Sequence, residues 1–212
     1  RFCIPVQTPI WDRGIVDQRS DVFLGVAGSL SADPALLEYA DCILLAGVEV
    51  DYRLGYLTKA RNVHRLNSGW HQMPGILSME GLLPFTDWLE EVRELRTRFG
   101  EVIEAGGEKQ RQAGRMHAVD LIGALRQYLP DEATLVIDGG SIGQWAHHLL
   151  ADRRYPGHWL TCGRSGVVGY GIGGAMAARL AHPDRPVVLL SGDGAFTFTV
   201  ADLECAVRNN LP

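Results

Sequence analysis

Short apolar runs alternate along this chain with stretches whose apolar residues recur at helical spacing. Four runs in the first half are predicted as strands: 3–8, 23–28, 41–47 and 62–66. Two stretches are predicted as helices: 34–39, with Asp33 as N-cap and Pro34 at the first helical position, and 85–96. Strands that alternate with helices are typical of βαβ units and a parallel sheet.

The second half repeats this alternation with more glycine. Buried strands are predicted at 134–138 and 187–190. Helices are predicted at 116–128, at 141–150 and at 200–209 with Thr199 as N-cap, and a Gly/Ala-rich block at 162–180 ends in a helical stretch. Between the halves, residues 98–115 are charged and interrupted by glycine, which predicts a surface linker with some helix. We therefore expect an α/β protein with two Rossmann-like parallel-sheet domains, at 1–97 and 116–212.

Composition and charge narrow the class of protein. The 212 residues are 46% hydrophobic and 21% charged, as in a globular protein, and no apolar run is long enough to span a membrane. A net charge of −5 argues against nucleic acid or an anionic membrane as the main partner. The four cysteines form no CxxC pair, so we expect small buried thiols rather than zinc ligands, and a cytoplasmic location.

The strongest chemical signal follows the strand at 187–190, which runs into Gly192-Asp193-Gly194. Ligands bind at the carboxyl ends of strands in open α/β sheets, and flanking glycines let backbone approach a ligand closely. A carboxylate at that position is a hard oxygen donor suited to Mg²⁺, which proteins usually share with substrate phosphates. These residues predict a metal-bridged phosphate site. Gly140 and Ser141 open a helix after the strand at 134–138, and such a helix start can hold an anion.

Other polar residues are predicted to have no catalytic role. His147 and His148 are adjacent, so on a helix they point about 100° apart and are expected at its surface or an interface. His158 follows Pro156-Gly157 in a loop and could line the site, although no spacing argument ties it there. Asp202 and Glu204 face different ways on a helix, which argues against a shared metal.

Gly192-Asp193-Gly194-Ala195-Phe196, followed by 202–208 and Leu211-Pro212, resembles the start of the thiamine-diphosphate (ThDP) signature. The family is the acetolactate synthase-like group, which includes oxalyl-CoA decarboxylases and 2-hydroxyacyl-CoA lyases. The resemblance implies ThDP and Mg²⁺ as cofactors, Asp193 as a metal ligand, and Gly192, Gly194 and Ala195 as cofactor-binding residues. It makes the second domain a partial ThDP pyrophosphate-binding fold. The family's second metal ligand, an Asn, lies further along than Asn209 or Asn210, so it has no match.

The same resemblance assigns the other cofactor-binding residues. Gly140 and Ser141 match the turn that contacts the diphosphate. The Gly166 carbonyl would accept a hydrogen bond from the aminopyrimidine amino group, and Val168 would take the place of a larger Met, Ile or Leu under the cofactor. Ile142 stands where acetolactate synthases often carry His, and Gly173 where Pro is common.

Residues 1–97 resemble the middle domain of this family, which binds FAD in acetolactate synthases and ADP in oxalyl-CoA decarboxylases. Glu49 stands where the FAD pattern tends to carry Arg, and residues 66–68 lack the acidic groups expected for ribose hydroxyls. These departures favour a spacer domain with an empty or degenerate pocket over FAD or ADP binding.

The resemblance implies a ThDP- and Mg²⁺-dependent C–C lyase or ligase acting on 2-keto acids, an acetolactate synthase-like transferase or decarboxylase. The alternative enzyme is an oxalyl-CoA decarboxylase or 2-hydroxyacyl-CoA lyase with an acyl-CoA substrate. A non-catalytic nucleotide-binding module is the alternative of another class. In this family the activating Glu lies on an N-terminal pyrimidine-binding domain, usually of the neighbouring subunit of a homodimer or homotetramer. No residue here takes that role, so we expect a piece of a longer protein that is inactive alone.

Overall fold

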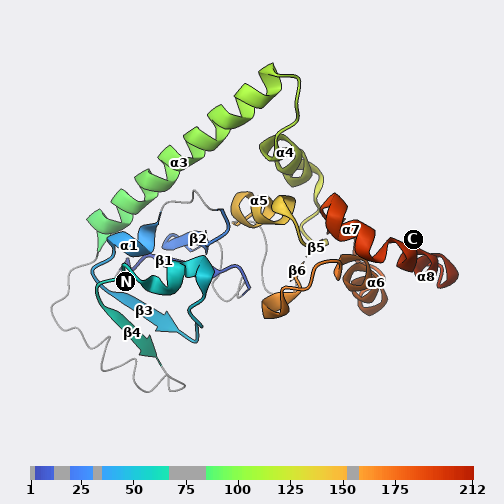
Figure 1. The fold of residues 1–212 in the computed structure, drawn as a ribbon, viewed down its shortest axis with the longest axis horizontal. Coiled ribbons are helices and arrows are strands. Elements are labelled where there is room, and N and C mark those ends of the chain that lie inside the picture. Colours follow the sequence, from blue (N-terminus) through green and yellow to red (C-terminus); the bar gives the residue numbers. More distant parts are fainter. Residues whose placement is uncertain (1–2, 12–19, 31–34, 67–84, 152–157) are drawn as a thin grey trace.

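Two groups of elements with parallel strands make up the fold. The computed structural model describes residues 3–11, 20–30, 35–66, 85–151 and 158–212. In Figure 1 the N-terminal group is blue to cyan and the C-terminal group yellow to red. The long helix α3 (Thr86–Gln112) rises from the first group and leads to α4 (Ala118–Tyr128) beside the second. The predicted α/β class with parallel sheets is confirmed.

The four strands predicted in the first half are present, each somewhat shorter than expected. They pair in parallel as β1 with β2 and β3 with β4: β1 is Val6–Pro9, β2 Phe23–Ala27, β3 Ile43–Ala46 and β4 Val63–Leu66. Short helical segments connect them: α1 is Leu36–Tyr39 and η1 is Tyr52–Leu57. The predicted helix start at Asp33 and Pro34 lies outside the described residues, as do Asn67 and Ser68.

Helix α3 extends well beyond the end predicted at residue 96. It continues through the charged segment because Ile103 and Gly107 are buried on one side of it. Next to this buried strip Arg111 forms an ion pair with Glu108, three residues earlier, at 2.9 Å, which is a spacing that stabilises helices, and a second with Glu104, two turns earlier, at 2.7 Å. The helix that was expected in part of the segment 98–115 thus extends to Gln112, while the role of this segment as a linker and the domain division stay predictions.

Helix α4 begins with a reciprocal cap. The His117 side chain accepts a hydrogen bond from the Val119 backbone N–H at 3.2 Å, and the Asp120 carboxylate accepts one from the His117 N–H at 3.1 Å. This arrangement satisfies two of the backbone donors that a helix start leaves free. It explains why the predicted helix starts at Ala118 rather than at Met116.

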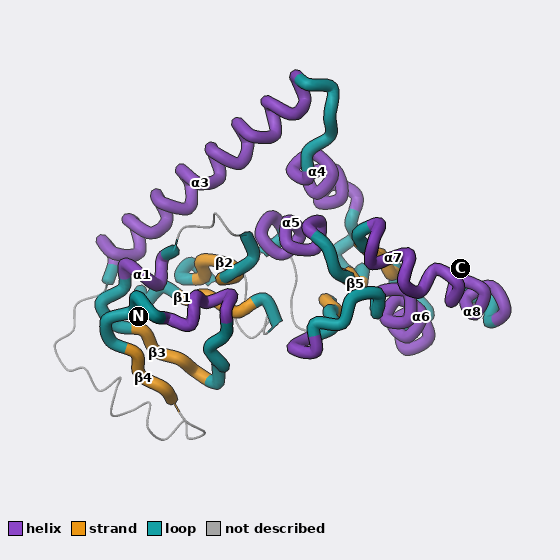
Figure 2. The backbone as a smooth tube through the Cα atoms, in the orientation of Figure 1, coloured by secondary structure: helices purple, strands orange, loops and turns teal. Residues whose placement is uncertain are grey.

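The C-terminal group is a three-stranded parallel sheet flanked by helices (Figure 2). Its strand order is β6-β5-β7, and Thr134 to Ile137 of β5 pair with Val187 to Leu190 of β7. The elements are β5 (Thr134–Ile137), α5 (Ser141–Leu149), β6 (Trp159–Leu160), η3 (Gly163–Ser165), α6 (Gly171–Ala181), β7 (Val187–Leu190), α7 (Asp193–Thr199), η4 (Val200–Asp202) and α8 (Leu203–Arg208). Strand β6 was not predicted.

Helical structure near the C-terminus begins at Asp193, seven residues before the predicted start at residue 200. Asp193 is the first residue of α7, so Gly192-Asp193-Gly194 is a helix start rather than a loop. Thr199 ends α7 and stands at the N-cap position of η4, as predicted, but its hydroxyl donates to the Gly169 carbonyl at 2.8 Å instead of capping that helix. This bond attaches α7 to the segment that precedes α6.

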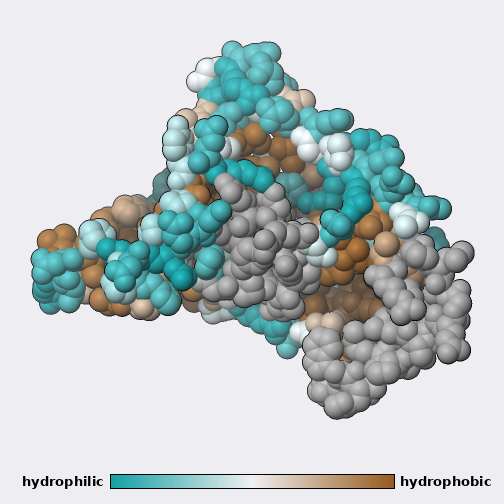
Figure 3. Space-filling view, turned by 180° about the vertical axis from the view of Figure 1, so that it is seen from behind, coloured by the Kyte–Doolittle hydropathy of each residue, from teal (hydrophilic) through white to brown (hydrophobic). Residues whose placement is uncertain are grey.

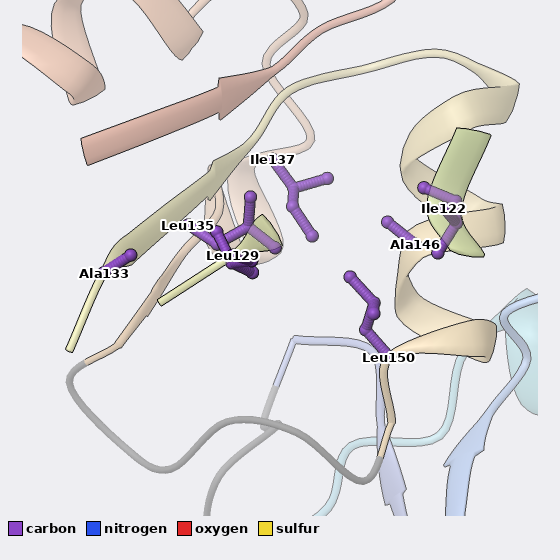
Figure 4. Close-up of a cluster of buried hydrophobic side chains, with 7 residues drawn as sticks. All are labelled: Ile122, Leu129, Ala133, Leu135, Ile137, Ala146 and Leu150. Carbon is purple, nitrogen blue, oxygen red and sulfur yellow. The ribbon is translucent and has the colours of Figure 1, made fainter. Parts of the chain in front are cut away.

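Buried side chains of α4, β5 and α5 form the core of the C-terminal group (Figure 4). Its members are all nearly inaccessible to solvent: Ile122, Leu129, Ala133, Leu135, Ile137, Ala146 and Leu150. A second cluster joins β2, α1 and α3 through Leu24, Leu36, Leu89 and Val92. Ala151, just after α5, packs against Ile10 and Val26 and connects the two groups.

Among the described helices, none is long and apolar enough to cross a membrane. The expectation of buried thiols is wrong for Cys42, which is exposed, while Cys3, Cys162 and Cys205 are partly buried. All four are free, and no group of three or more metal-ligating side chains occurs in the described part of the chain.

Candidate cofactor site

Two glycine turns meet at the carboxyl ends of β5 and β7. The strands pair with Ile137 opposite Leu190, so the residues that follow each strand lie side by side. The Gly192 N–H donates to the Gly139 carbonyl at 3.2 Å. The predicted residues Gly140 and Gly192 are therefore neighbours at the edge where α/β sheets bind ligands.

The close approach of the two turns requires glycine at positions 140 and 192. A Cβ on Gly192 would lie 2.9 Å from the Gly139 carbonyl oxygen, closer than carbon and oxygen pack. A Cβ on Gly140 would lie 3.4 Å from the Gly192 Cα, and Gly140 has a φ of 103°, which other residues rarely adopt. The turns form a shallow backbone-lined surface with exposed Gly140 and Ser141 at the start of the nine-residue helix α5.

Val168 lies against the first turn. A Cβ on Gly139 would be 3.0 Å from the Val168 Cγ1, and Val168 remains 47% exposed. Gly166, two residues earlier, ends η3 in the left-handed region with a φ of 63° and is exposed. An exposed valine beside a polar backbone surface is available for contact with the apolar part of a ligand.

Asp193 lies at the start of α7 with an exposed side chain. No hydrogen bond or ion pair joins its carboxylate to the rest of the described chain. Gly194 beside it is exposed, and Ala195 is 4% exposed and packs inward. A carboxylate at the amino end of a helix, next to a glycine turn, fits a cation shared with a phosphate. In the described residues Asp193 belongs to no group of three or more metal-ligating side chains, so a Mg²⁺ here would take most of its oxygen ligands from elsewhere.

Asp138 is a central residue of the site that the sequence analysis missed. It follows β5, is 5% exposed, and accepts hydrogen bonds from the N–H groups of Gly139 at 2.6 Å, Gly169 at 2.9 Å and Gly171 at 3.0 Å. The Ser191 hydroxyl lies 3.4 Å from its Oδ2. The sequence did contain a signal for this role, because an aspartate stands directly between a predicted buried strand and two glycines.

Tyr170 adds a buried phenol behind these turns. Its hydroxyl has no hydrogen-bond partner among the described residues. Burial, followed by the nearby Cys162 and Asp138, raises its pKa. Tyr170 is therefore protonated at neutral pH and cannot act there as a base.

The histidines lie away from the turns. His147 is 3% exposed and stacks on Trp159 with ring centroids 5.5 Å apart, so the prediction of a surface or interface position is wrong for it. His148 lies between the two groups, 3.4 Å from the Ser29 hydroxyl and edge-on to Phe99. The His158 carbonyl accepts from the Leu135 N–H next to β6, so its backbone belongs to the sheet.

A pocket of about 270 Å³ lies at the carboxyl ends of β1 and β2. Arg53 lies 4.2 Å from the centroid of the Trp11 ring and 4.4 Å from that of Tyr52. Glu49 forms an ion pair with Arg164 of η3 at 2.6 Å. The charges that face this pocket are thus partly neutralised by one another, and the pocket reaches from the N-terminal group to η3.

The two glycines that flank Asp193 give a first prediction about stability. Gly192→Ala should cost about 1–3 kcal/mol, because the new methyl meets a backbone carbonyl that cannot move alone. Gly194→Ala is the matched control, since nothing lies within 4 Å of its Cβ position, and it should stabilise α7 by about 0.5–1 kcal/mol. Urea unfolding of the cofactor-free protein measures both. Equal effects of the two changes would contradict the close approach of the turns.

A second prediction concerns pH. Burial, and then the charge of Arg96, lower the pKa of His148 to about 4. In the unfolded chain His148 therefore binds a proton near pH 6.5, whereas in the folded chain it stays neutral until about pH 4. The free energy of unfolding consequently falls as the pH drops from about 6.5 to 4. Between pH 7 and pH 5 the loss from this partly exposed group should be about 1–2 kcal/mol.

His148→Gln should remove this part of the pH dependence, while His182→Gln, at an exposed position, should keep it. Urea unfolding at both pH values gives the comparison. An unchanged slope in His148→Gln would show that this imidazole is not held neutral in the fold.

Comparisons with known proteins agree with this geometry. Residues 138–212 match the family described as thiamine pyrophosphate enzyme, C-terminal TPP binding domain. The chain is 33% identical over 98% of its length to a probable acetolactate synthase of Mycobacterium bovis, covering 40% of that protein. It is 32% identical over 84% of its length to human 2-hydroxyacyl-CoA lyase 2, covering 32% of it, and 25% identical over its whole length to the acetolactate synthase large subunit of Haemophilus influenzae, covering 41%.

The chain belongs to the ThDP enzymes, in their acetolactate synthase-like group, as its motifs predicted. It spans about a third to two fifths of the length of the relatives that it matches. The matched segment begins at Asp138 and contains both glycine turns and Val168.

Proposed function

We propose that this chain is part of a ThDP- and Mg²⁺-dependent enzyme that makes or cleaves a C–C bond next to the carbonyl group of a 2-keto acid. The observation that carries the proposal is the meeting of the two glycine turns, with the Gly192 N–H on the Gly139 carbonyl and the exposed Asp193 beside them. The membership in the acetolactate synthase-like group supports it.

The residues present fit the cofactor. Gly140 and Ser141 would bind the diphosphate through backbone N–H groups at the start of α5, and the lack of a side chain at Gly192 would let the diphosphate approach the turns closely. Asp193 would bind Mg²⁺ together with the phosphate oxygens. Gly194 and Ala195 would line the same side of the site, at the start of α7.

Two further residues would orient the organic part of the cofactor. The Gly166 carbonyl would accept from the aminopyrimidine, and Val168 would pack against the apolar middle of ThDP. ThDP supplies a nucleophilic carbon and an electron sink for the bond that is made or broken. This chain binds, orients and shields the cofactor, and we assign it no catalytic side chain.

We propose that residues 1–97, which resemble the middle domain of the family, form a spacer rather than a flavin-binding domain. The proposal rests on the departures from the flavin pattern rather than on pocket size, since the described residues of this segment line pockets of about 270 Å³ and about 420 Å³. Glu49, which stands where the flavin pattern carries Arg, is already paired with Arg164. We further propose a homodimer or homotetramer in the cytoplasm, in which a pyrimidine-binding domain supplies the activating Glu.

The identity to human 2-hydroxyacyl-CoA lyase 2 favours a second candidate, an acyl-CoA lyase. The full-length protein with ThDP and Mg²⁺ should be assayed for consumption of pyruvate and for cleavage of a 2-hydroxyacyl-CoA and oxalyl-CoA. Turnover of pyruvate alone supports the first candidate, and turnover of an acyl-CoA supports the second. Absence of turnover with all three substrates, in a protein that binds both cofactors, would contradict the proposed activity.

A further inference from the structure

We propose that Asp138 is a positioning residue that sets the relative placement of the cofactor-binding turns. This inference rests on the proposed function, because it concerns residues of the same site. Asp138 would not itself touch ThDP or Mg²⁺, but it would hold in place the segments that do.

Asp138 is a buried carboxylate without a cation. It is 5% exposed, and no lysine, arginine or histidine forms an ion pair with it in the described chain. Burial of an unpaired carboxylate is costly unless hydrogen-bond donors replace water. Three backbone N–H groups do so within 3.0 Å, and the Ser191 hydroxyl shares its proton between Asp138 at 3.4 Å and the Gly192 carbonyl at 3.2 Å.

These donors come from three different segments of the site. Gly139 belongs to the turn after β5, Gly169 and Gly171 flank the start of α6, and Ser191 precedes the turn after β7. Each donor is adjacent to, or part of, a segment that would contact the cofactor. One rigid carboxylate therefore fixes the turn at 139–141, Val168 and the turn at 192–194 relative to one another.

The glycines around Asp138 show that the space is filled by this residue. A Cβ on Gly171 would lie 2.7 Å from the Asp138 Oδ2, and a Cβ on Gly143 would lie 2.7 Å from the Asp138 carbonyl oxygen. Helices α5 and α6 thus approach β5 closely only because these two positions lack side chains. The arrangement is specific to an aspartate, since every hydrogen bond that it makes is accepted and none is donated.

The test compares Asp138→Asn with Asp120→Asn in the full-length protein. Asparagine keeps the shape but turns an NH₂ toward backbone N–H groups, so the turns should shift. We expect the ThDP dissociation constant at saturating Mg²⁺ to rise by about 10- to 100-fold, as for other residues that orient ligands. Asp120→Asn disrupts the cap of α4 and its contact with Arg111, away from the turns, and should lower the unfolding temperature without changing the affinity for ThDP.

Gly171→Ala reaches the same carboxylate from the opposite side and should weaken ThDP binding in the same way. Ser191→Ala removes only the longest contact and should change the affinity by about threefold or less. Amide hydrogen exchange at Gly169 and Gly171 supplies a readout without cofactor: both should exchange faster in Asp138→Asn than in wild type. KM for ThDP should rise while kcat at saturating ThDP changes little.

The outcomes separate this inference from the proposed function. If the wild-type protein does not bind ThDP with Mg²⁺, the proposed function fails. If the wild type binds and Asp138→Asn binds equally well with only a lower unfolding temperature, Asp138 is merely structural and the inference fails. If Asp138→Asn does not fold, Gly171→Ala decides: unchanged ThDP affinity in that variant overturns the positioning role.

Discussion

Asp193→Ala is expected to reduce Mg²⁺-dependent ThDP binding by about 100-fold or more while the fold remains intact. The side chain is exposed and forms no bond to the rest of the described chain, so its loss should leave the unfolding free energy within about 0.5 kcal/mol of wild type. The loss of affinity arises because the metal that bridges protein and diphosphate loses its carboxylate.

Asp202→Ala is the matched control. Asp202 is also exposed and lies nine positions further along, in η4. The Asp202→Ala variant should therefore bind ThDP with the same affinity as the wild type. Calorimetric titration of ThDP at fixed Mg²⁺ provides the comparison, and equal affinities of Asp193→Ala and Asp202→Ala would remove Asp193 from the metal site.

Val168→Asp should weaken ThDP binding by about two to three orders of magnitude without unfolding the protein. In the cofactor-free fold Val168 is 47% exposed, so an aspartate there remains solvated. When ThDP binds, its apolar middle would cover this position and leave a carboxylate buried without a partner, which costs several kcal/mol.

The neighbouring residue separates this effect from a general charge effect. Val167 is 53% exposed and does not lie next to Gly139, whereas Val168 packs directly on it. Val167→Asp should therefore lower the affinity for ThDP by about threefold or less. Equal losses in both variants would show that charge near the site, rather than the surface under the cofactor, decides binding.

The central features of the site could be predicted because they depend on local sequence. A buried strand that leads into Gly192-Asp193-Gly194 places its carboxylate at a strand end in any parallel sheet. The pairing of β5 with β7, which brings Gly140 beside Gly192, was not predicted, because strand order depends on contacts between segments distant in sequence. The contact of Val168 with the cofactor is implied by the resemblance and stays a prediction.

Features that depend on tertiary contacts were missed. The full length of the helix through residues 98–112 was not predicted, because it depends on the burial of Ile103 and Gly107 in the folded chain. Asp138 is buried only because the segments around Gly169 and Ser191, distant in sequence, supply donors. His147 is likewise buried by Trp159, which belongs to a strand of two residues.

One surface is left apolar by the described residues. Exposed apolar side chains occur on α6, α7 and α8, among them Leu180, Phe198 and Val207. Figure 3 shows brown side chains interleaved with teal ones at that end of the molecule.

The most direct test of the account is the binding of ThDP to the full-length wild-type protein, titrated by calorimetry with Mg²⁺ and again with a chelator. We expect saturable binding with one ThDP per chain that requires Mg²⁺ and is lost in Asp193→Ala. Absence of binding with Mg²⁺ present, or binding of equal affinity with the chelator, would contradict it.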